Sequence, residues 1–253
     1  MHLLGGIMIL LQRYGFPSRL GREEQAIYTY AILERVPVRL FEAGDLALSD
    51  LDCCLLVGSV ETFEAALSLI GVAIPKPNYY PSILQHTFGR HIWKGVVSDI
   101  IRLVNNGVSI FSKPFDVWKQ FPGQVFHPGS TPPFLLSMDP DMPVWLSDVI
   151  CIESEYRCYV LDHRLVACCQ YTGEVDDQPD MSVVLDSMMR LSEEESTPCS
   201  YVIDFGKTTS GETVLIENGD MFAVGRYQGI SDRDYYRCLK ARWDELTNKT
   251  LLR

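Results

Sequence analysis

The first third of the chain alternates short apolar runs with amphipathic segments. Three apolar runs bounded by turn residues predict strands, at residues 3–11, 36–41 and 51–59. Two segments with apolar positions at helical spacing predict helices, at residues 22–35 and 60–71. The order strand, helix, strand, strand, helix predicts a small α/β domain with a partly parallel sheet, which we place at residues 1–80. A linker is marked by three prolines within residues 75–81.

Residues 81–253 form a second predicted domain with a less regular order of elements. A helix is predicted to begin at Lys94, because Val96, Ile100 and Val104 recur at helical spacing before Gly107. Further strands are predicted at residues 108–115, within 116–126, and at 143–153, 155–164, 165–174, 201–205 and 213–216. Further helices are predicted at residues 181–191 and 231–246.

A cluster of acids follows from the last predicted hairpin, whose strands flank the polar segment 206–211. Asp204 lies within the first strand, and Glu217, Asn218 and Asp220 follow the second. Pairing of the strands would bring Asp204 close to Glu217 or its neighbours, and such oxygen ligands suit magnesium. A lone acid of this kind is more often solvated at a hairpin mouth. Burying Asp204 without a partner would be costly, however, which favours a functional cluster.

Three basic residues precede this cluster. Lys113 ends a predicted strand, Lys119 follows it ahead of a turn at Gly123, and Arg157 lies among aromatic strand residues. Lysines for the phosphates, an arginine for the charge developing on the γ-phosphate and acids for magnesium together predict a phosphoryl-transfer site. Each lysine alone could be a solvated surface residue, and Arg157 could simply pair with Glu155.

The ordered motifs resemble the ATP-grasp superfamily, and more narrowly its phage and bacterial branch named for one arginine and two lysines. The matching pieces are Lys113-Pro114 with Lys119 and Gly123, Glu155-x-Arg157, Asp204 in VIDFG, the terminal IEN, and the A-h-G-x-Y pattern (h, hydrophobic) at residues 223–227. The resemblance covers roughly residues 90–230. It implies an α+β ATP-grasp fold over residues 81–253, in which two α+β subdomains sandwich ATP, preceded by the small α/β domain.

The resemblance also implies an activity: the ATP- and Mg²⁺-dependent joining of a carboxylate substrate to an amine acceptor, a peptide or protein among the options, through an acyl phosphate. The implied site residues are Lys113 and Lys119 for phosphates, Lys94 as a further phosphate candidate, Asp148 for the ribose, Glu155 beside Arg157, Arg157 for the transferred phosphoryl group, and Asp204 and Glu217 for magnesium. Lys94 fits a surface lysine equally well. An ATP-grasp phosphotransferase and a non-catalytic nucleotide- or protein-binding module are the alternatives.

One departure from the superfamily pattern concerns the last metal strand, which usually ends in Glu-x-Asn. Here Asn218 follows Glu217 directly, and in an unbroken strand it would point away from the metal. Either the backbone bulges at Gly219 and turns Asn218 round, or Asp220 supplies the missing oxygen.

Composition narrows the possible partners. The formal net charge of −11 argues against nucleic acid and anionic membranes as partners, since both attract basic surfaces. The eight cysteines show no zinc-type spacing and read as reduced thiols of a cytoplasmic protein. The apolar start of the chain is too short to span a bilayer.

Overall fold

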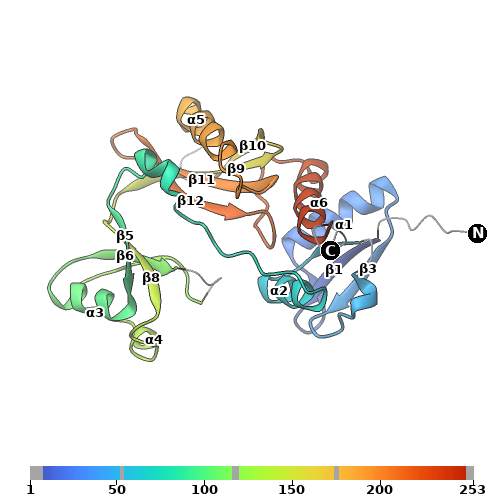
Figure 1. The fold of residues 1–253 in the computed structure, drawn as a ribbon, viewed down its shortest axis with the longest axis horizontal. Coiled ribbons are helices and arrows are strands. Elements are labelled where there is room, and N and C mark those ends of the chain that lie inside the picture. The colour runs from blue at the N-terminus through green and yellow to red at the C-terminus, as the bar shows by residue number, and fades with distance from the viewer. Residues whose placement is uncertain (1–7, 52–53, 116–119, 174–176, 249–253) are drawn as a thin grey trace, which may run out of the picture.

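Three four-stranded sheets organise the structure (Figure 1), a computed structural model that describes residues 8–51, 54–115, 120–173 and 177–248. The N-terminal sheet is centred on β1 (Met8–Tyr14), which pairs in parallel with β3 (Val38–Glu42) and β4 (Cys54–Val57) and antiparallel with the short β2 (Arg19–Leu20). Its helices are α1 (Arg22–Glu34), α2 (Val60–Leu69) and the 3₁₀ turn η1 (Leu48–Asp50). These helices and the parallel strand pairs confirm the predicted α/β pattern of this region.

The middle sheet is antiparallel and has the order β5-β8-β6-β7. Its elements are β5 (Ile92–Val96), α3 (Val97–Asn105), β6 (Ile110–Pro114), β7 (Gln124–Phe126), α4 (Pro133–Leu136) and β8 (Pro143–Ser147). The prediction that a helix begins at Lys94 is wrong, because Lys94 lies in β5 and α3 begins only at Val97. Pairing of β5 with the distant β8 overrides the local helical spacing.

The C-terminal sheet is also antiparallel, with the order β10-β9-β11-β12. Its strands are β9 (Ile152–Leu161), β10 (Arg164–Thr172), β11 (Ser200–Thr208) and β12 (Thr213–Asp220). Asp162 and His163 form the β9–β10 turn with positive φ angles of 48° and 59°. Both predicted hairpins, β9–β10 and β11–β12, are therefore confirmed.

Two helices cover opposite faces of the C-terminal sheet. Alternate β9 residues Cys158 and Val160 pack with α5 (Met181–Ser192) and the 3₁₀ segment η2 (Ser82–Thr87). The intervening Tyr159 packs with α6 (Asp232–Asn248). The core under α6 continues into the N-terminal sheet, where Phe63 meets Trp243 of α6 edge-on at 5.3 Å between ring centroids. The N-terminal sheet and the C-terminal sheet thus share a core.

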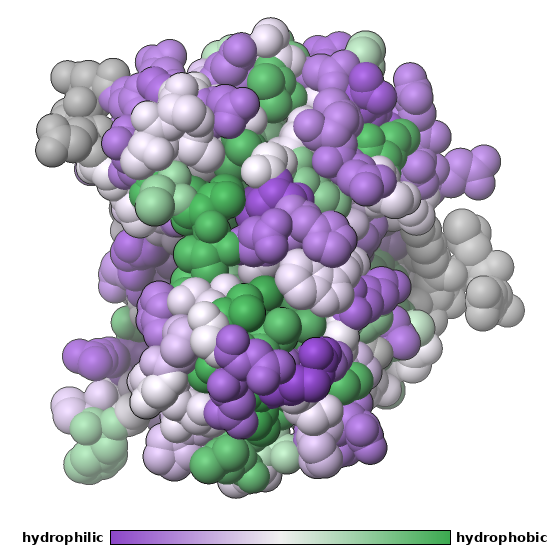
Figure 2. All heavy atoms as spheres, turned by 90° about the vertical axis from the view of Figure 1, so that its left-hand side faces the viewer, coloured by the Kyte–Doolittle hydropathy of each residue, from purple (hydrophilic) through white to green (hydrophobic). Residues whose placement is uncertain are grey.

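The surface is mixed in character. Figure 2 shows polar and apolar side chains interspersed over the side of the molecule that carries the middle sheet. In the described residues, no helix combines the length and the apolar character needed to cross a bilayer.

Candidate active site

Three strands of the C-terminal sheet line up the central charges of the site. Arg157 of β9 lies opposite Asp204 of β11, and Asp204 lies opposite Glu217 of β12. Directly opposed residues project from the same face of an antiparallel sheet. This confirms the prediction that the hairpin brings Asp204 close to Glu217, on the face that also carries Tyr159 and Val202.

Arg157 and Asp204 form a buried, two-pronged ion pair. The guanidinium donates from Nε to Asp204 Oδ1 at 2.9 Å and from Nη2 to Oδ2 at 2.7 Å. Arg157 is 9% exposed and Asp204 3%. Burial raises the pKa of the Asp204 carboxyl, and the charge and hydrogen bonds of Arg157 act against that shift. Burial also disfavours the charged guanidinium, but the Asp204 carboxylate more than offsets this and the pKa of Arg157 is raised. The partner of Arg157 is therefore Asp204 rather than Glu155.

Lys113 carries the charge pattern across to the middle sheet. It lies in β6, is 7% exposed, and its ammonium donates to Glu217 Oε2. Its Nζ also lies 3.3 Å from the centroid of the Tyr79 ring, a cation–π contact. Burial lowers the pKa of Lys113, while the charge of Glu217 acts in the opposite direction. Two buried or half-buried ion pairs therefore stand side by side where the two sheets meet.

A bulge in β12 sets the position of Glu217. Asp204 pairs with Glu217 and the next residue, Phe205, pairs with Leu215, so Ile216 is the extra residue in β12. Gly219 lies in regular register opposite Val202, which shows that the strand does not bulge there. The bulge predicted as one option at Gly219 is therefore found three residues earlier.

The other two predicted metal ligands lie apart from the Asp204–Glu217 pair. The Asn218 side chain donates from Nδ2 to the Asn78 carbonyl at 3.1 Å. Both carboxylate oxygens of Asp220 accept hydrogen bonds from Arg242 of α6, at 2.6 Å each. In this structure Asn218 and Asp220 anchor the end of β12 to the linker and to α6.

The predicted phosphate-binding lysines share one face of the middle sheet where they are described. Lys94 and Lys113 both lie opposite Trp145 of β8, one on each side. The exposed Lys94 has its Nζ 4.3 Å from the centroid of the Phe115 ring. Lys119 lies outside the described residues.

Asp148 and Glu155 take different positions. Asp148 follows β8, is exposed, and accepts a hydrogen bond from the His91 backbone nitrogen at 3.2 Å. Glu155 lies two residues before Arg157 in β9 and hence on the same face of the strand. The structure brings Glu155 toward the charge cluster and places Asp148 at the connection between the middle and C-terminal sheets.

The segment that matched A-h-G-x-Y holds Arg157 from the other side. The Gly225 carbonyl accepts hydrogen bonds from Arg157 Nη1 at 3.3 Å and from the Tyr159 hydroxyl at 2.8 Å. The Tyr227 ring centroid lies 5.1 Å from the guanidinium carbon of Arg157, and Tyr171 stacks on Tyr227. This motif therefore orients the arginine rather than contributing charge.

These groups border a cavity of about 260 Å³, which we call the phosphate cavity. Its walls include Lys113, Arg157, Glu217 and residues of the Phe121–Gly123 turn and the Phe222–Gly225 segment. Sequence reasoning missed Tyr79, which also lines it; the only signal was a pair of aromatic residues inside the proline-rich linker.

The donor types suit magnesium, but the oxygens are engaged by side chains. Asp204 and Glu217 are adjacent carboxylates, and magnesium commonly takes one or two carboxylates plus phosphate oxygens. Within the described residues no group of three or more His, Cys, Asp or Glu is arranged to hold a metal ion. Arg157 and Lys113 occupy the positions of cations next to the two acids. The pair therefore fits the ion when phosphates draw these bases away.

Two antiparallel sheets that meet at a buried charge cluster, joined to an N-terminal α/β unit, define an ATP-grasp fold. A family model described as an ATP-grasp domain, family 2 of its clade, matches residues 88–238, so the chain belongs to this ATP-grasp family. This confirms the predicted superfamily and fold class.

Solved structures agree with the fold. The chain is similar to a RimK domain ATP-grasp protein from Sphaerobacter thermophilus, with 16% identity, a TM-score of 0.54, and 96% of this chain and 99% of that chain covered. D-cycloserine synthetase DcsG gives 11% identity, a TM-score of 0.60, and coverage of 95% and 100%. D-alanine–D-alanine ligase from Bacillus anthracis gives 11%, 0.51, and coverage of 96% and 99%. No protein of curated function matches the sequence.

Proposed function

We propose that the protein is an ATP- and magnesium-dependent ligase that joins a carboxylate to an amine through an acyl phosphate. The observation that carries the proposal is the row Lys113–Glu217–Asp204–Arg157, in which bases and acids alternate from the middle sheet to the C-terminal sheet. A polyphosphate must be neutralised on several sides at once, and this row supplies cations from both sheets. The structural neighbours named as ligases support the proposal.

The bases act on the phosphates. Lys113 would exchange Glu217 for phosphate oxygens, and Lys94, on the same face of the middle sheet, would approach them from the side. Lys119 keeps its sequence-based assignment to a phosphate. Arg157, held by Asp204 and the Gly225 carbonyl, would stabilise the charge that develops on the transferred phosphoryl group.

The acids hold the cation. Asp204 and Glu217 would ligate magnesium, and a magnesium ion there would neutralise charge on the phosphate oxygens. Because Arg157 and Lys113 are their present partners, phosphate binding and release of the acids are coupled. Asn218 and Asp220 could join only after leaving Asn78 and Arg242.

The remaining assignments follow the fold. Asp148, at the connection between the two sheets, would contact the ribose, with adenine beside the backbone of β8. Glu155 would lie at the edge of the same site. We propose that residues 1–80 form the domain preceding the ATP-grasp domain of residues 81–253.

The reaction has two steps. A carboxylate oxygen of the first substrate attacks the γ-phosphorus, the bond to the β–γ bridging oxygen breaks, and ADP leaves. The uncharged amine nitrogen then attacks the acyl carbon, inorganic phosphate leaves, and the nitrogen loses a proton to solvent as the C–N bond forms. The chain supplies positioning and charge but no nucleophile.

The first test combines calorimetric ATP titration, with and without magnesium, and trapping of acyl phosphates by hydroxylamine in a carboxylate screen. Glu217→Gln should abolish the magnesium dependence of ATP affinity, and Glu212→Gln, on the same hairpin but exposed, should not. Transfer of phosphate without any trapped hydroxamate would favour a phosphotransferase. Absence of ATP binding by the wild type would refute the proposal and favour a protein-binding module.

A further inference from the structure

A second cavity, of about 380 Å³, lies in the N-terminal part of the molecule next to the phosphate cavity. It opens at the carboxyl ends of the parallel strands β1 and β4, where Tyr14 and the segment Leu56–Ser59 line it. Ligands of open α/β sheets commonly bind at this edge. The volume corresponds to roughly a dozen water molecules, enough for a small organic molecule or the end of a peptide.

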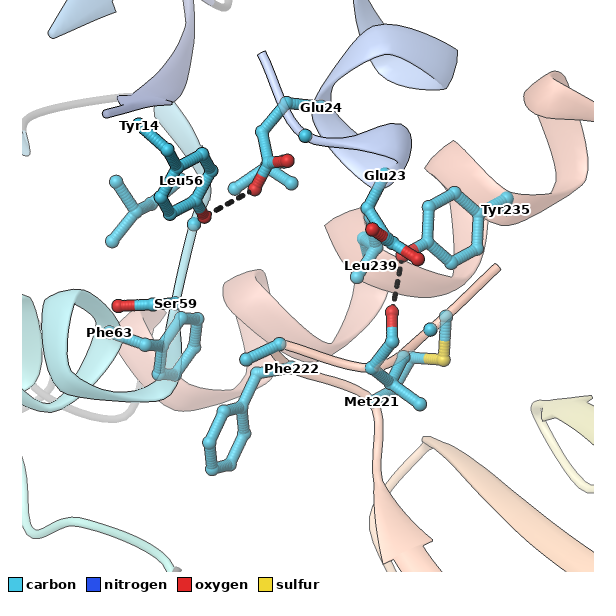
Figure 3. Close-up of a pocket in the computed structure, with 16 residues that line it drawn as sticks. Tyr14, Glu23, Glu24, Leu56, Ser59, Phe63, Met221, Phe222, Tyr235 and Leu239 are labelled. Carbon is cyan, nitrogen blue, oxygen red and sulfur yellow. Dashed lines mark hydrogen bonds between the residues drawn. The ribbon is translucent and has the colours of Figure 1, made fainter. Parts of the chain in front are cut away.

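The charges that line this cavity are all of one sign. Glu23 and Glu24, at the start of α1, are its charged lining residues, and none of the described lining residues is Lys, Arg or His. The exposed Arg22, which pairs with Glu23 at 3.2 Å, lies outside the lining. Figure 3 shows both carboxylates extending from α1 toward the space above Met221 and Phe222. Apolar side chains form the rest of the wall: Leu56, Phe63, Met221, Phe222 and Leu239.

Glu24 is a buried acid without a cation. It is 4% exposed, accepts a hydrogen bond from the Tyr14 hydroxyl at 2.8 Å, and forms no salt bridge with any described residue. Burial raises the pKa of its carboxyl. An unpaired buried carboxylate is costly, and a cationic ligand is the partner that would relieve the cost.

Glu23 links this cavity to the phosphate cavity. Its Oε1 accepts a hydrogen bond from the Arg226 backbone nitrogen at 3.2 Å. A methyl group built on Gly225 would lie 3.7 Å from Glu23 Oε1 and 3.5 Å from Arg157 Nη1. Gly225 therefore separates the acids of one cavity from the catalytic arginine of the other by little more than one atom, and both cavities share the Phe222–Gly225 wall.

An anionic ligand is excluded by the same residues. The N-terminal end of α1, which could attract an anion, already carries Glu23 and Glu24. A phosphate in the cavity would face two carboxylates and no described basic side chain of the lining.

We propose that this cavity binds the primary amine substrate in its ammonium form, with the Glu23 and Glu24 carboxylates as its charge partners and the apolar wall receiving its carbon chain. The role as acceptor site rests on the proposed ligase function; the binding of an ammonium group does not. The amine would wait beside Gly225, next to the position where Arg157 holds the activated carboxylate.

The test measures binding without catalysis. Butylammonium, with butanol as its uncharged counterpart and inorganic phosphate as an anion, is titrated into the full chain and followed by ligand-observed NMR. Butylammonium should bind, and butanol and phosphate should bind at least tenfold more weakly. Glu23→Gln and Glu24→Gln should each weaken butylammonium binding about tenfold to a hundredfold, the usual range for a hydrogen bond to a charged group. Glu34→Gln, which removes the same charge from the exposed end of α1, should bind as wild type does.

Several results would overturn the inference: no butylammonium binding, equal binding of phosphate, or equal losses in Glu34→Gln. Should Glu24→Gln fail to fold, Glu23→Gln decides, since that side chain is 28% exposed and tolerates change. ATP titration of the same samples separates the two proposals. ATP binding and hydroxamate trapping with no effect of either glutamine variant on butylammonium would refute only the amine site. Butylammonium binding that depends on Glu23, with no ATP binding, would refute the ligase and leave the ammonium site standing.

Discussion

The two cavities that meet at Gly225 differ in how their charges are compensated. In the phosphate cavity each acid of the row has a basic partner, Arg157 for Asp204 and Lys113 for Glu217. In the second cavity Glu24 has only the Tyr14 hydroxyl. Paired charges keep a buried site folded without its ligand and require a partner exchange when the ligand arrives. An unpaired buried acid instead holds its charge available for a cation, at a cost in stability.

The largest expected effect comes from breaking the buried pair of the phosphate cavity. Asp204→Ala leaves Arg157 buried without a partner and should lower the free energy of unfolding by about 3–5 kcal/mol, measured by urea denaturation. Asp186→Ala, at a partly exposed carboxylate of α5, should change it by no more than about 0.5 kcal/mol. Replacing both partners, Arg157→Met with Asp204→Leu, should cost less than Asp204→Ala alone. Equal losses for Asp204→Ala and Asp186→Ala would show that the pair does not matter for folding.

The next effect concerns ligand affinity. Lys113→Ala should weaken ATP binding about tenfold to a hundredfold, because it removes a buried cation from the phosphates. Lys94→Ala, at an exposed position on the same sheet face, should weaken it less. Calorimetry of both variants checks the order, and a larger loss in Lys94→Ala would contradict the placement of the phosphates beside Lys113.

The smallest effect is a pH dependence that belongs to the second cavity. The folded-state pKa of Glu24 is raised above its unfolded value by burial. A raised pKa contributes stability that is full below the unfolded value, near 4.5, and is lost as the pH rises through the folded value. Denaturation of wild type and Glu24→Gln between pH 4 and 7 should therefore show wild type losing ground to the variant as the pH rises. A difference that is constant with pH, or that moves the other way, would show that Glu24 is not strained by burial.

Local sequence patterns were sufficient for most elements and for the heart of the site. Helices α1, α2 and α5 follow from apolar spacing, and the β11–β12 hairpin follows from its glycine-bounded turn. The pairing of Asp204 with Glu217 could be predicted because both acids lie on the arms of one hairpin, close together in sequence.

Features set by distant partners could not be predicted. The strand at Lys94 depends on β8, about fifty residues later, while its own spacing favours a helix. Asp220 is taken by Arg242, whose position on α6 carries no signal in the sequence. Glu23 and Glu24 look like ordinary acids at a helix start. Their cavity exists only because the Met221–Gly225 segment, two hundred residues away, folds against α1.

The central claim is that two neighbouring cavities of different charge character bind two different ligands, and one calorimetric matrix tests it most directly. Magnesium-ATP and butylammonium are each titrated into wild type, Lys113→Ala and Glu23→Gln. The account predicts that Lys113→Ala weakens only magnesium-ATP and that Glu23→Gln weakens only butylammonium. Variants that weaken both ligands equally, or neither, would contradict it.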